Sequence, residues 1–167
     1  MKRDEFVDTL KKLKGGDKTA LSSIYHEYFS KIYFTAFWTV KNRHDAYDIA
    51  MDVIMRLCNY AGDPAEIRNP VGLIAKMTKN EVNDYFRMKH HCVVADMEVL
   101  RGAKTQTDAL WIEDIFKCLT LQEREILIDH VVWGKKLKEI AHAKNKSYIT
   151  LKREYATIKK KIKELYK

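Results

Sequence analysis

Residues that interrupt helices are scarce in this chain, which contains two prolines and six glycines among 167 residues. Proline removes a backbone donor and glycine weakens helices, so both usually mark loops. The apolar residues recur at helical intervals almost throughout, and no segment shows the alternation typical of strands. We therefore predict an all-α fold class.

Cysteines and long apolar runs are also scarce. Cys58, Cys92 and Cys118 are odd in number and scattered, which argues against a disulfide framework and fits reduced thiols. His90 and His91 precede Cys92, but no second Cys/His pair at zinc spacing accompanies them, so we expect no metal site. There is no signal peptide and no apolar run long enough to span a bilayer. We expect a cytoplasmic protein with no membrane partner and no cofactor.

Acidic residues are outnumbered, since 31 Lys and Arg against 23 Asp and Glu give a formal net charge of +8. A basic excess favours a nucleic-acid partner. Hydrophobic residues make up 46% of the chain, which is enough to bury a core. The chain is long enough for one domain or for two small ones.

The basic residues concentrate near the C-terminus, in a predicted helix-turn-helix. A short helix over residues 137–141 is separated by residues 144–146 from a second helix that begins at Ser147 and runs to Leu165. Ser147 can cap this helix, and Thr150 lies in its first turn. The bases from residue 144 onward are Lys144, Lys146, Lys152, Arg153, Lys159, Lys160, Lys161, Lys163 and Lys167. This pattern favours a polyanion partner such as DNA.

A helix predicted over residues 45–57 has the opposite character, because its charged face is mainly acidic. That face carries Asp45, Asp48, Asp52 and Arg56 at steps of three and four. One interpretation is a solvated face with an Asp52–Arg56 ion pair worth a few tenths of a kcal/mol. The other is a docking surface for a protein with basic residues, because DNA phosphates would repel the carboxylates.

Other helices are predicted around this segment. The first ends at Gly15 and Gly16, and Asp17 is placed to cap an aromatic-rich helix over residues 21–37 that we expect to be core. A loop around residues 62–70 precedes a helix over residues 71–90. That helix offers cations, amides and aromatic rings suited to phosphates and unstacked bases, namely Lys76, Lys79, Asn80, Asn83, Tyr85, Phe86, Arg87, Lys89 and His90. An ordinary surface helix is the alternative interpretation.

The helical periodicity weakens after this helix, where Gly102 and a polar segment indicate a flexible linker. We predict two small helical domains, residues 1–92 and 110–167, joined by a linker over residues 93–109. In the second domain, Thr120 and Glu123 form a predicted capping box. The helix that they open is expected to end at Trp133 and Gly134.

In their order and spacing, these motifs resemble a bacterial sigma factor of the small two-domain extracytoplasmic-function (ECF) group. Region 2, a helical bundle, would lie at about residues 10–92, and region 4, a helix-turn-helix, at about residues 108–167. The residues that carry the resemblance are Gly16, Asp17, Ala20, Tyr25, Tyr28, Asp45 to Asp48, Asp52, Leu57, Asn80 to Asp84, Arg87, Leu119, Glu123 to Leu127, Gly134, Glu139 to Ala141, Ser147, Thr150 and Lys152.

The resemblance implies a protein that is not an enzyme and that directs core RNA polymerase to specific promoters. Asp45, Asp48, Asp52 and Arg56 would bind the clamp helices of the largest polymerase subunit, and region 4 would contact the flap of the second largest. The loop over residues 59–71 would engage and open minus-ten promoter DNA together with Lys76, Lys79, Asn80, Asn83, Asp84 and Arg87. The minus-thirty-five element would be read by Lys146, Ser147, Tyr148, Thr150, Lys152 and Arg153. An anti-sigma protein is a further possible partner.

The chain departs from the family pattern at several positions. Asn145 replaces the usual turn glycine, which Asn tolerates in a left-handed conformation, and Lys136 replaces a capping Ser. Glu154 stands where Arg is common. A carboxylate facing phosphate would weaken DNA binding, unless it pairs with a neighbouring lysine.

Two alternatives stay open. A stand-alone helix-turn-helix transcriptional regulator would bind an operator at moderate salt without polymerase. An enzyme would need Asp45, Asp48 and Asp52 as metal-binding carboxylates, but no phosphate loop, activated nucleophile or His/Cys ligand set accompanies them.

Overall fold

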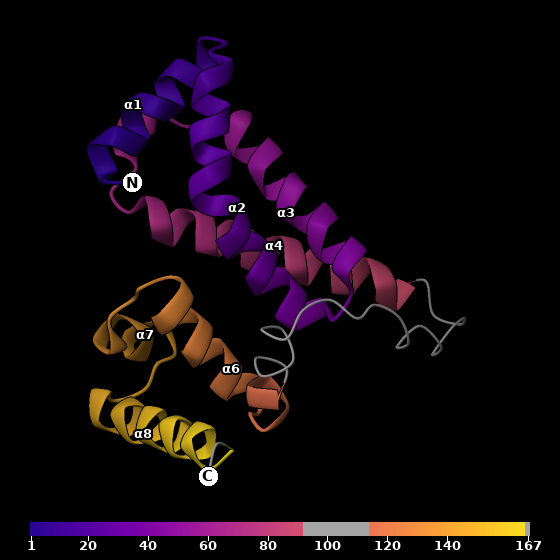
Figure 1. Cartoon of the computed structure of the whole chain (residues 1–167). Coiled ribbons are helices and arrows are strands. Elements are labelled where there is room, and N and C mark those ends of the chain that lie inside the picture. Colours follow the sequence, from indigo (N-terminus) through magenta and orange to yellow (C-terminus); the bar gives the residue numbers. More distant parts are fainter. Residues whose placement is uncertain (92–113, 166–167) are drawn as a thin grey trace. The chain divides into compact units, whose positions relative to one another are not determined.

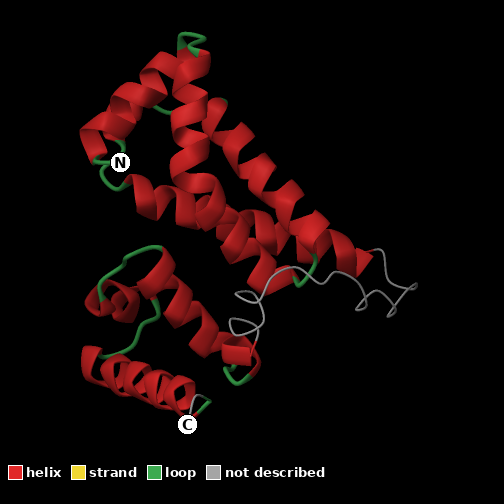
Figure 2. Cartoon of the chain, viewed as in Figure 1, coloured by secondary structure: helices red, strands yellow, loops and turns green. Residues whose placement is uncertain are grey.

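The computed structural model describes residues 1–91 and 114–165, with the side chains of residues 90 and 91 left out. The chain divides into two compact units, Met1–Val93 and Val94–Lys167. Within the described residues the regular elements are all helical, which confirms the predicted all-α fold class (Figure 1, Figure 2). The predicted linker and the side chains of His90, His91 and Cys92 lie outside the described residues.

The first unit consists of α1 (Arg3–Lys14), α2 (Lys18–Val40), α3 (Arg43–Cys58) and α4 (Pro70–His91), with a short 3-10 turn η1 (Pro64–Glu66) before α4. Gly16 adopts a positive φ of 87° after α1. Asp17 then caps α2 by accepting a hydrogen bond from the Thr19 amide at 2.8 Å. The end of α1 before these glycines and the Asp17 cap were predicted, whereas the cap of α3 by Asn42 was not.

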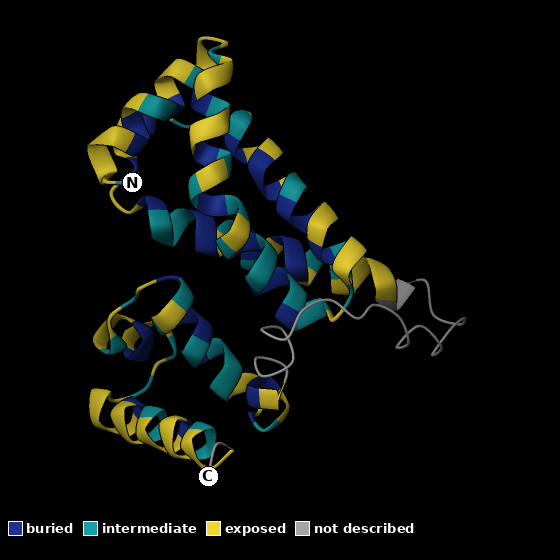
Figure 3. Cartoon of the chain, in the orientation of Figure 1, coloured by how far each residue is buried: buried dark blue, intermediate teal, exposed yellow. Residues whose placement is uncertain are grey.

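The core of the first unit forms where α2, α3 and α4 pack together (Figure 3). Ala36, Ala46, Ile49 and Val82 make up its central cluster. On α1, Phe6 packs edge-on against Tyr28 of α2, with 5.7 Å between the ring centroids. The aromatic helix is therefore core along one face, as predicted. Beside that face the half-buried rings of Tyr25 and Phe29, which were also expected in the core, stack with 4.5 Å between their centroids.

The described part of the second unit begins with a helical turn over residues 114–117. It continues through α6 (Leu121–Leu127), the π-helical turn η2 (Ile128–Val132), α7 (Leu137–Ala143) and α8 (Tyr148–Glu164). The predicted capping box is confirmed, since the Thr120 amide donates to Glu123 at 2.9 Å and the Glu123 amide donates to Thr120 at 3.3 Å.

The turn between α7 and α8 is the one expected of a helix-turn-helix. Asn145 adopts a left-handed φ of 52°, and Ser147 caps α8 by accepting from the Thr150 amide at 3.1 Å. Ile140 of α7 packs into a core shared with Leu151 and Ile158 of α8, and all three are at most 1% exposed. In the described part of the chain, no helix is both long and apolar enough to cross a membrane.

Candidate protein and nucleic-acid interfaces

An acidic face lies on the solvent side of α3. Asp48 and Asp52, one helical turn apart, are both exposed. We call these two residues the acidic face. The opposite side of α3 is held in the core by Ala46, Ala50 and Val53, each fully buried. The helix therefore cannot rotate to hide its carboxylates.

The other two residues predicted on this face turn toward α4. The Asp45 carboxylate accepts a hydrogen bond from the Tyr85 hydroxyl at 2.5 Å and lies 3.7 Å from the Lys89 ammonium. Arg56 forms an ion pair with Glu81 of α4. The predicted Asp52–Arg56 pair is therefore wrong, because a buried carboxylate on the neighbouring helix holds the guanidinium instead. No pattern within α3 indicated this partner, which lies 25 positions further along the chain.

Burial sets the electrostatics of Glu81, whose side chain is 8% exposed. Loss of solvation raises the pKa of this carboxyl, and the Arg56 guanidinium counteracts the increase only in part. The acidic neighbours Asp52 and Asp84 raise the pKa further. Burial likewise raises the pKa of the Tyr85 hydroxyl, which also donates to Asp45. These contacts fix the faces that α3 and α4 turn toward each other.

Beside the Arg56–Glu81 pair lies an open polar pocket of about 270 Å³. It is lined by Arg56, Asn80, Asn83, Asp84 and Arg87. Within it, the Arg87 guanidinium donates to the Asp84 carboxylate at 3.0 Å, which restrains the arginine at the pocket wall. Two guanidinium groups and two amides suit phosphate oxygens and base edges. The structure thus brings four of the predicted minus-ten residues together with Arg56.

The remaining predicted minus-ten residues lie outside this pocket. Lys76 is exposed and Lys79 is half-buried, both on α4. Phe86 is 36% exposed and contacts Tyr85 edge-on at 5.3 Å, so an aromatic face remains accessible near the end of α4.

An apolar stripe beside the acidic face was missed in the sequence analysis. Tyr47 and Met55 are 47% and 51% exposed, and Met51 lies between them, half-buried. The ring of Tyr47 packs edge-on against the ring of Phe29 of α2, with 5.5 Å between the ring centroids. The available signal was the spacing of four residues between these three side chains, which places them on one face of the helix.

The exposed side of α8 carries most of the residues predicted to read duplex DNA. Tyr148, Thr150, Lys152 and Arg153 are all exposed, while the Ser147 hydroxyl is engaged in the helix cap. Lys138 of α7 lies over the Tyr148 ring at 5.6 Å. Ile149, at 63% exposed, lies among these cations and was not predicted. Figure 3 shows exposed positions along the whole of α8.

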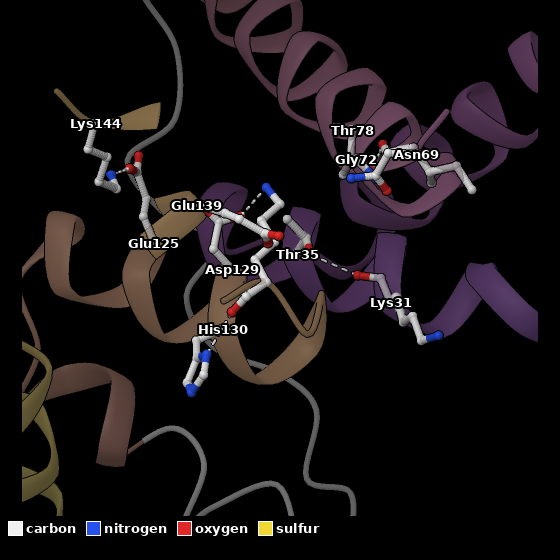
Figure 4. Close-up of polar contacts among 12 residues, drawn as sticks. Lys31, Thr35, Asn69, Gly72, Thr78, Glu125, Asp129, His130, Glu139 and Lys144 are labelled. Atoms are coloured by element: carbon white, nitrogen blue, oxygen red, sulfur yellow. Dashed lines mark hydrogen bonds and ion pairs between the residues drawn. The ribbon is translucent and has the colours of Figure 1, made fainter. Parts of the chain in front are cut away.

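Glutamates neutralise several of the basic residues in this unit. Lys146 pairs with Glu154 at 2.6 Å, which is the lysine pairing considered for Glu154. Lys144 pairs with Glu125 of α6, as seen in Figure 4. Lys161 pairs with Glu123 at 2.8 Å. Burial works to raise the pKa of Glu123, but hydrogen bonds from Lys161 and Thr120 outweigh it and lower the pKa.

The outward-facing cations of α8 are therefore Lys152, Arg153, Lys159, Lys160 and Lys163. They extend over a helix of 17 residues, about 26 Å long.

The described residues contain no group of three or more His, Cys, Asp or Glu side chains that is placed to bind a metal ion.

Comparison with known proteins finds matches among solved structures alone. No protein-family model matches it, and no curated protein matches it. Among seven matching chains of solved structures, one comes from a 1.8 Å structure of an RsbN–BldN complex. That likeness has a TM-score of 0.38 and 14% sequence identity, and covers 93% of this chain and 98% of that one. A TM-score this low establishes no shared fold, so the proposals below rest on the residues of this chain.

Proposed function

We propose that the protein is a sigma factor of the extracytoplasmic-function group, which binds core RNA polymerase and directs it to specific promoters. The observation that carries this proposal is the polar pocket on the first unit. It joins Arg56 of α3, the helix with the acidic face, to the cations and amides of α4. A surface suited to a protein partner therefore adjoins a surface suited to nucleic acid. A stand-alone regulator that binds duplex DNA does not need this combination of surfaces.

Docking on polymerase is proposed to use the acidic face. Exposed Asp48 and Asp52 would meet basic residues on the clamp helices of the largest subunit, since complementary charges steer and orient such encounters. The apolar stripe of Tyr47, Met51 and Met55 would add contact area beside the charges. An anti-sigma protein that covered this surface would compete with polymerase.

Strand opening is proposed to use the pocket and the neighbouring cations of α4. Opening needs no catalytic group, because it needs only a surface that stabilises unstacked, single-stranded bases relative to duplex. Arg56 and Arg87 would hold backbone phosphates, while Asn80 and Asn83 would hydrogen-bond base edges. Phe86, 36% exposed, offers a ring on which a base can stack.

Promoter recognition upstream is proposed to use α8. Its exposed N-terminal residues would enter the major groove at the minus-thirty-five element, with Arg153 and Lys152 as the main contacts. Pairing of Glu154 with Lys146 removes the repulsion that a free carboxylate would cause, but it also occupies one predicted DNA contact. The same unit would contact the flap of the second largest subunit.

A stand-alone helix-turn-helix regulator is the second candidate. The specific observation in its favour is that the cationic face of α8 lies entirely within the second unit. This candidate predicts that the free protein selects a duplex operator without polymerase.

In vitro transcription distinguishes the two candidates. Bacterial core polymerase, with and without the protein, is supplied with fragmented genomic DNA, and the 5′ ends of the transcripts are mapped. The proposal predicts new start sites that share elements about 10 and 35 base pairs upstream, roughly two to three helical turns apart. No new start sites, together with specific duplex binding by the free protein, would favour the regulator.

A further inference from the structure

The loop between α3 and α4, residues 59–69, concentrates stiffening features. Both prolines of the chain, Pro64 and Pro70, lie in it or directly after it. Proline fixes φ and lowers the conformational freedom of the unfolded chain. Asp63 caps η1 by accepting a hydrogen bond from the Ala65 amide at 2.9 Å. Asn69 accepts a hydrogen bond from the Gly72 amide at 2.9 Å, and Figure 4 shows these two residues.

Two glycines, Gly62 in this loop and Gly72 in the first turn of α4, have close side-chain neighbours. A Cβ on Gly72 would lie 2.9 Å from the Asn69 side-chain nitrogen, so a larger residue would displace that cap. A Cβ on Gly62 would lie 2.7 Å from the Tyr60 hydroxyl. These glycines therefore leave room for the Tyr60 ring and for the Asn69 side chain that caps α4.

Helix α1 holds the backbone of this loop from the side. The Arg3 guanidinium donates from Nε to the Ile67 carbonyl and from Nη2 to the Ala65 carbonyl, each at 3.0 Å. The Lys14 ammonium donates to the Gly62 carbonyl at 2.7 Å. Arg3 and Lys14 are the first and last residues of α1, about 16 Å apart along the helix axis. The loop therefore runs antiparallel to α1 and is held at both ends.

The braced loop has a buried side and an exposed side. Pro64 and Ile67 are buried, and η1 packs on α1. The exposed positions include four polar side chains that can contact a ligand, Asn59, Asp63, Glu66 and Arg68. A rigid loop presents such side chains with little ordering entropy left to lose on binding.

We infer that Arg3 and Lys14 are positioning residues for promoter opening, which hold residues 62–67 in the conformation that engages minus-ten DNA. This inference rests on the proposed function. Both cations donate to backbone carbonyls of the loop, so their hydrogen bonds fix its path. The Arg3 side chain is 47% exposed, and such exposed contacts contribute little to global stability. Their main effect is therefore on the shape of the loop.

The functional test uses polymerase holoenzyme and a promoter identified by transcription, with 2-aminopurine placed in the minus-ten element to report unstacking. The Arg3→Ala, Lys14→Met double variant is expected to open the promoter about tenfold less well, because three hydrogen bonds to the loop backbone are lost; tenfold corresponds to about 1.4 kcal/mol. Core polymerase affinity should stay within about twofold of wild type, because neither substitution changes Asp48 or Asp52. A variant with Arg3→Lys in place of Arg3→Ala keeps the charge at this position, and it should open the promoter better than the double variant does.

Lys11→Ala is the control for the loss of a cation from α1, because Lys11 is an exposed lysine of the same helix. It should open the promoter as wild type does. Opening by the double variant that equals wild type would overturn the inference. So would an equal loss in the Lys11→Ala control, which would assign the effect to the charge of α1 rather than to the loop.

Hydrogen exchange in the free protein tests the brace without polymerase. Amides of residues 60–69 should exchange several-fold faster in the double variant, while those of α3 stay unchanged. Unchanged exchange in the loop, or equally faster exchange across α2 and α3, would contradict the inference. If the proposed function is wrong, the wild-type protein will not bind core polymerase at all. The hydrogen bonds from Arg3 and Lys14 to the loop would then have no role in promoter opening.

Discussion

Helices α3 and α8 are built alike but present opposite charges. Each follows a capping residue, Asn42 or Ser147, and each buries one apolar stripe. The exposed side of α3 carries Asp48 and Asp52, whereas that of α8 carries cations such as Arg153. The same kinds of residue cap and bury the two helices. The choice of binding partner therefore depends on the charges of their exposed residues.

The two units also place their glutamates differently. In the first unit, Glu81 is buried between α3 and α4, and burial raises its pKa. In the second unit, Glu123 and Glu154 lie nearer the surface and pair with lysines. Formal charge alone therefore overstates the cations of the second unit that can meet DNA.

The largest expected effect contrasts the two cores. Leu151 of α8 and Leu57 of α3 are both fully buried, and truncation of either to Ala should cost about 2–5 kcal/mol. Leu151→Ala should unfold the second unit, because a small domain has only a few kcal/mol of stability. Leu57→Ala should lower the melting temperature of the first unit and leave the second unaffected. Calorimetry with separate assignment of the two transitions checks this, and a single shared transition would contradict it.

The next effect separates the two interfaces. Arg153→Ala should weaken promoter duplex binding about tenfold or more, since a base or phosphate contact by Arg is worth roughly 1–3 kcal/mol. Polymerase affinity should be unchanged. Lys117→Ala removes an exposed lysine of the same unit outside α8 and serves as the control. Promoter affinity that is the same in both variants would place the reading surface elsewhere.

A smaller effect is expected from the internal ion pairs. Glu154→Gln frees Lys146 and should tighten duplex binding several-fold, with the slope of log affinity against log salt steeper by about one. Glu164→Gln makes the same charge change at the far end of α8, where Glu164 lies 3.9 Å from Lys160, and should have less effect. Salt titrations of the two variants measure the difference. Equal slopes would show that Lys146 does not reach the DNA.

The smallest effect concerns pH and distinguishes the two glutamates by sign. A raised folded-state pKa means that protonated Glu81 stabilises the fold below its ordinary value of 4.5, and that this contribution is lost as pH rises through the folded pKa. Near neutral pH, the Glu81→Gln variant should therefore have a melting temperature equal to or above that of wild type. The difference in melting temperature should become smaller in acid.

Glu123 should behave in the opposite way. Its pKa is lowered, so the ionised form contributes stability above 4.5 that is lost as pH falls through the folded pKa. Glu123→Gln should be less stable than wild type near neutral pH, and the gap should close in acid. Melting curves across pH measure both variants, and gaps of the same sign would contradict the assignment.

Local features of the fold could be predicted from the sequence. Asp17 and Ser147 are good capping residues followed by helical patterns, and both cap the helices as expected. Asn145 was expected to take the left-handed position of a turn glycine, and does so. These features depend on residues within a few positions of one another, so the sequence displays them directly.

Contacts between distant residues could not be predicted in the same way. Arg56 has an acidic neighbour one turn away in Asp52, yet its partner is Glu81 on another helix. The bonds from Arg3 to the loop span more than sixty positions, with separations of 62 and 64. Side-chain reach and helix packing decide such pairs, and neither is visible in spacing along one helix.

Titration of the protein against bacterial core RNA polymerase tests the central claim most directly. Wild type should bind with submicromolar affinity, and Asp48→Lys with Asp52→Lys should weaken binding by about a hundredfold or more while the fold is retained, because like charges would then face each other. The control is Asp8→Lys with Asp114→Lys, an equal charge change at two other exposed aspartates, and it should bind as wild type does. Equal binding by the Asp48/Asp52 variant and wild type, or no binding by wild type, would contradict the account.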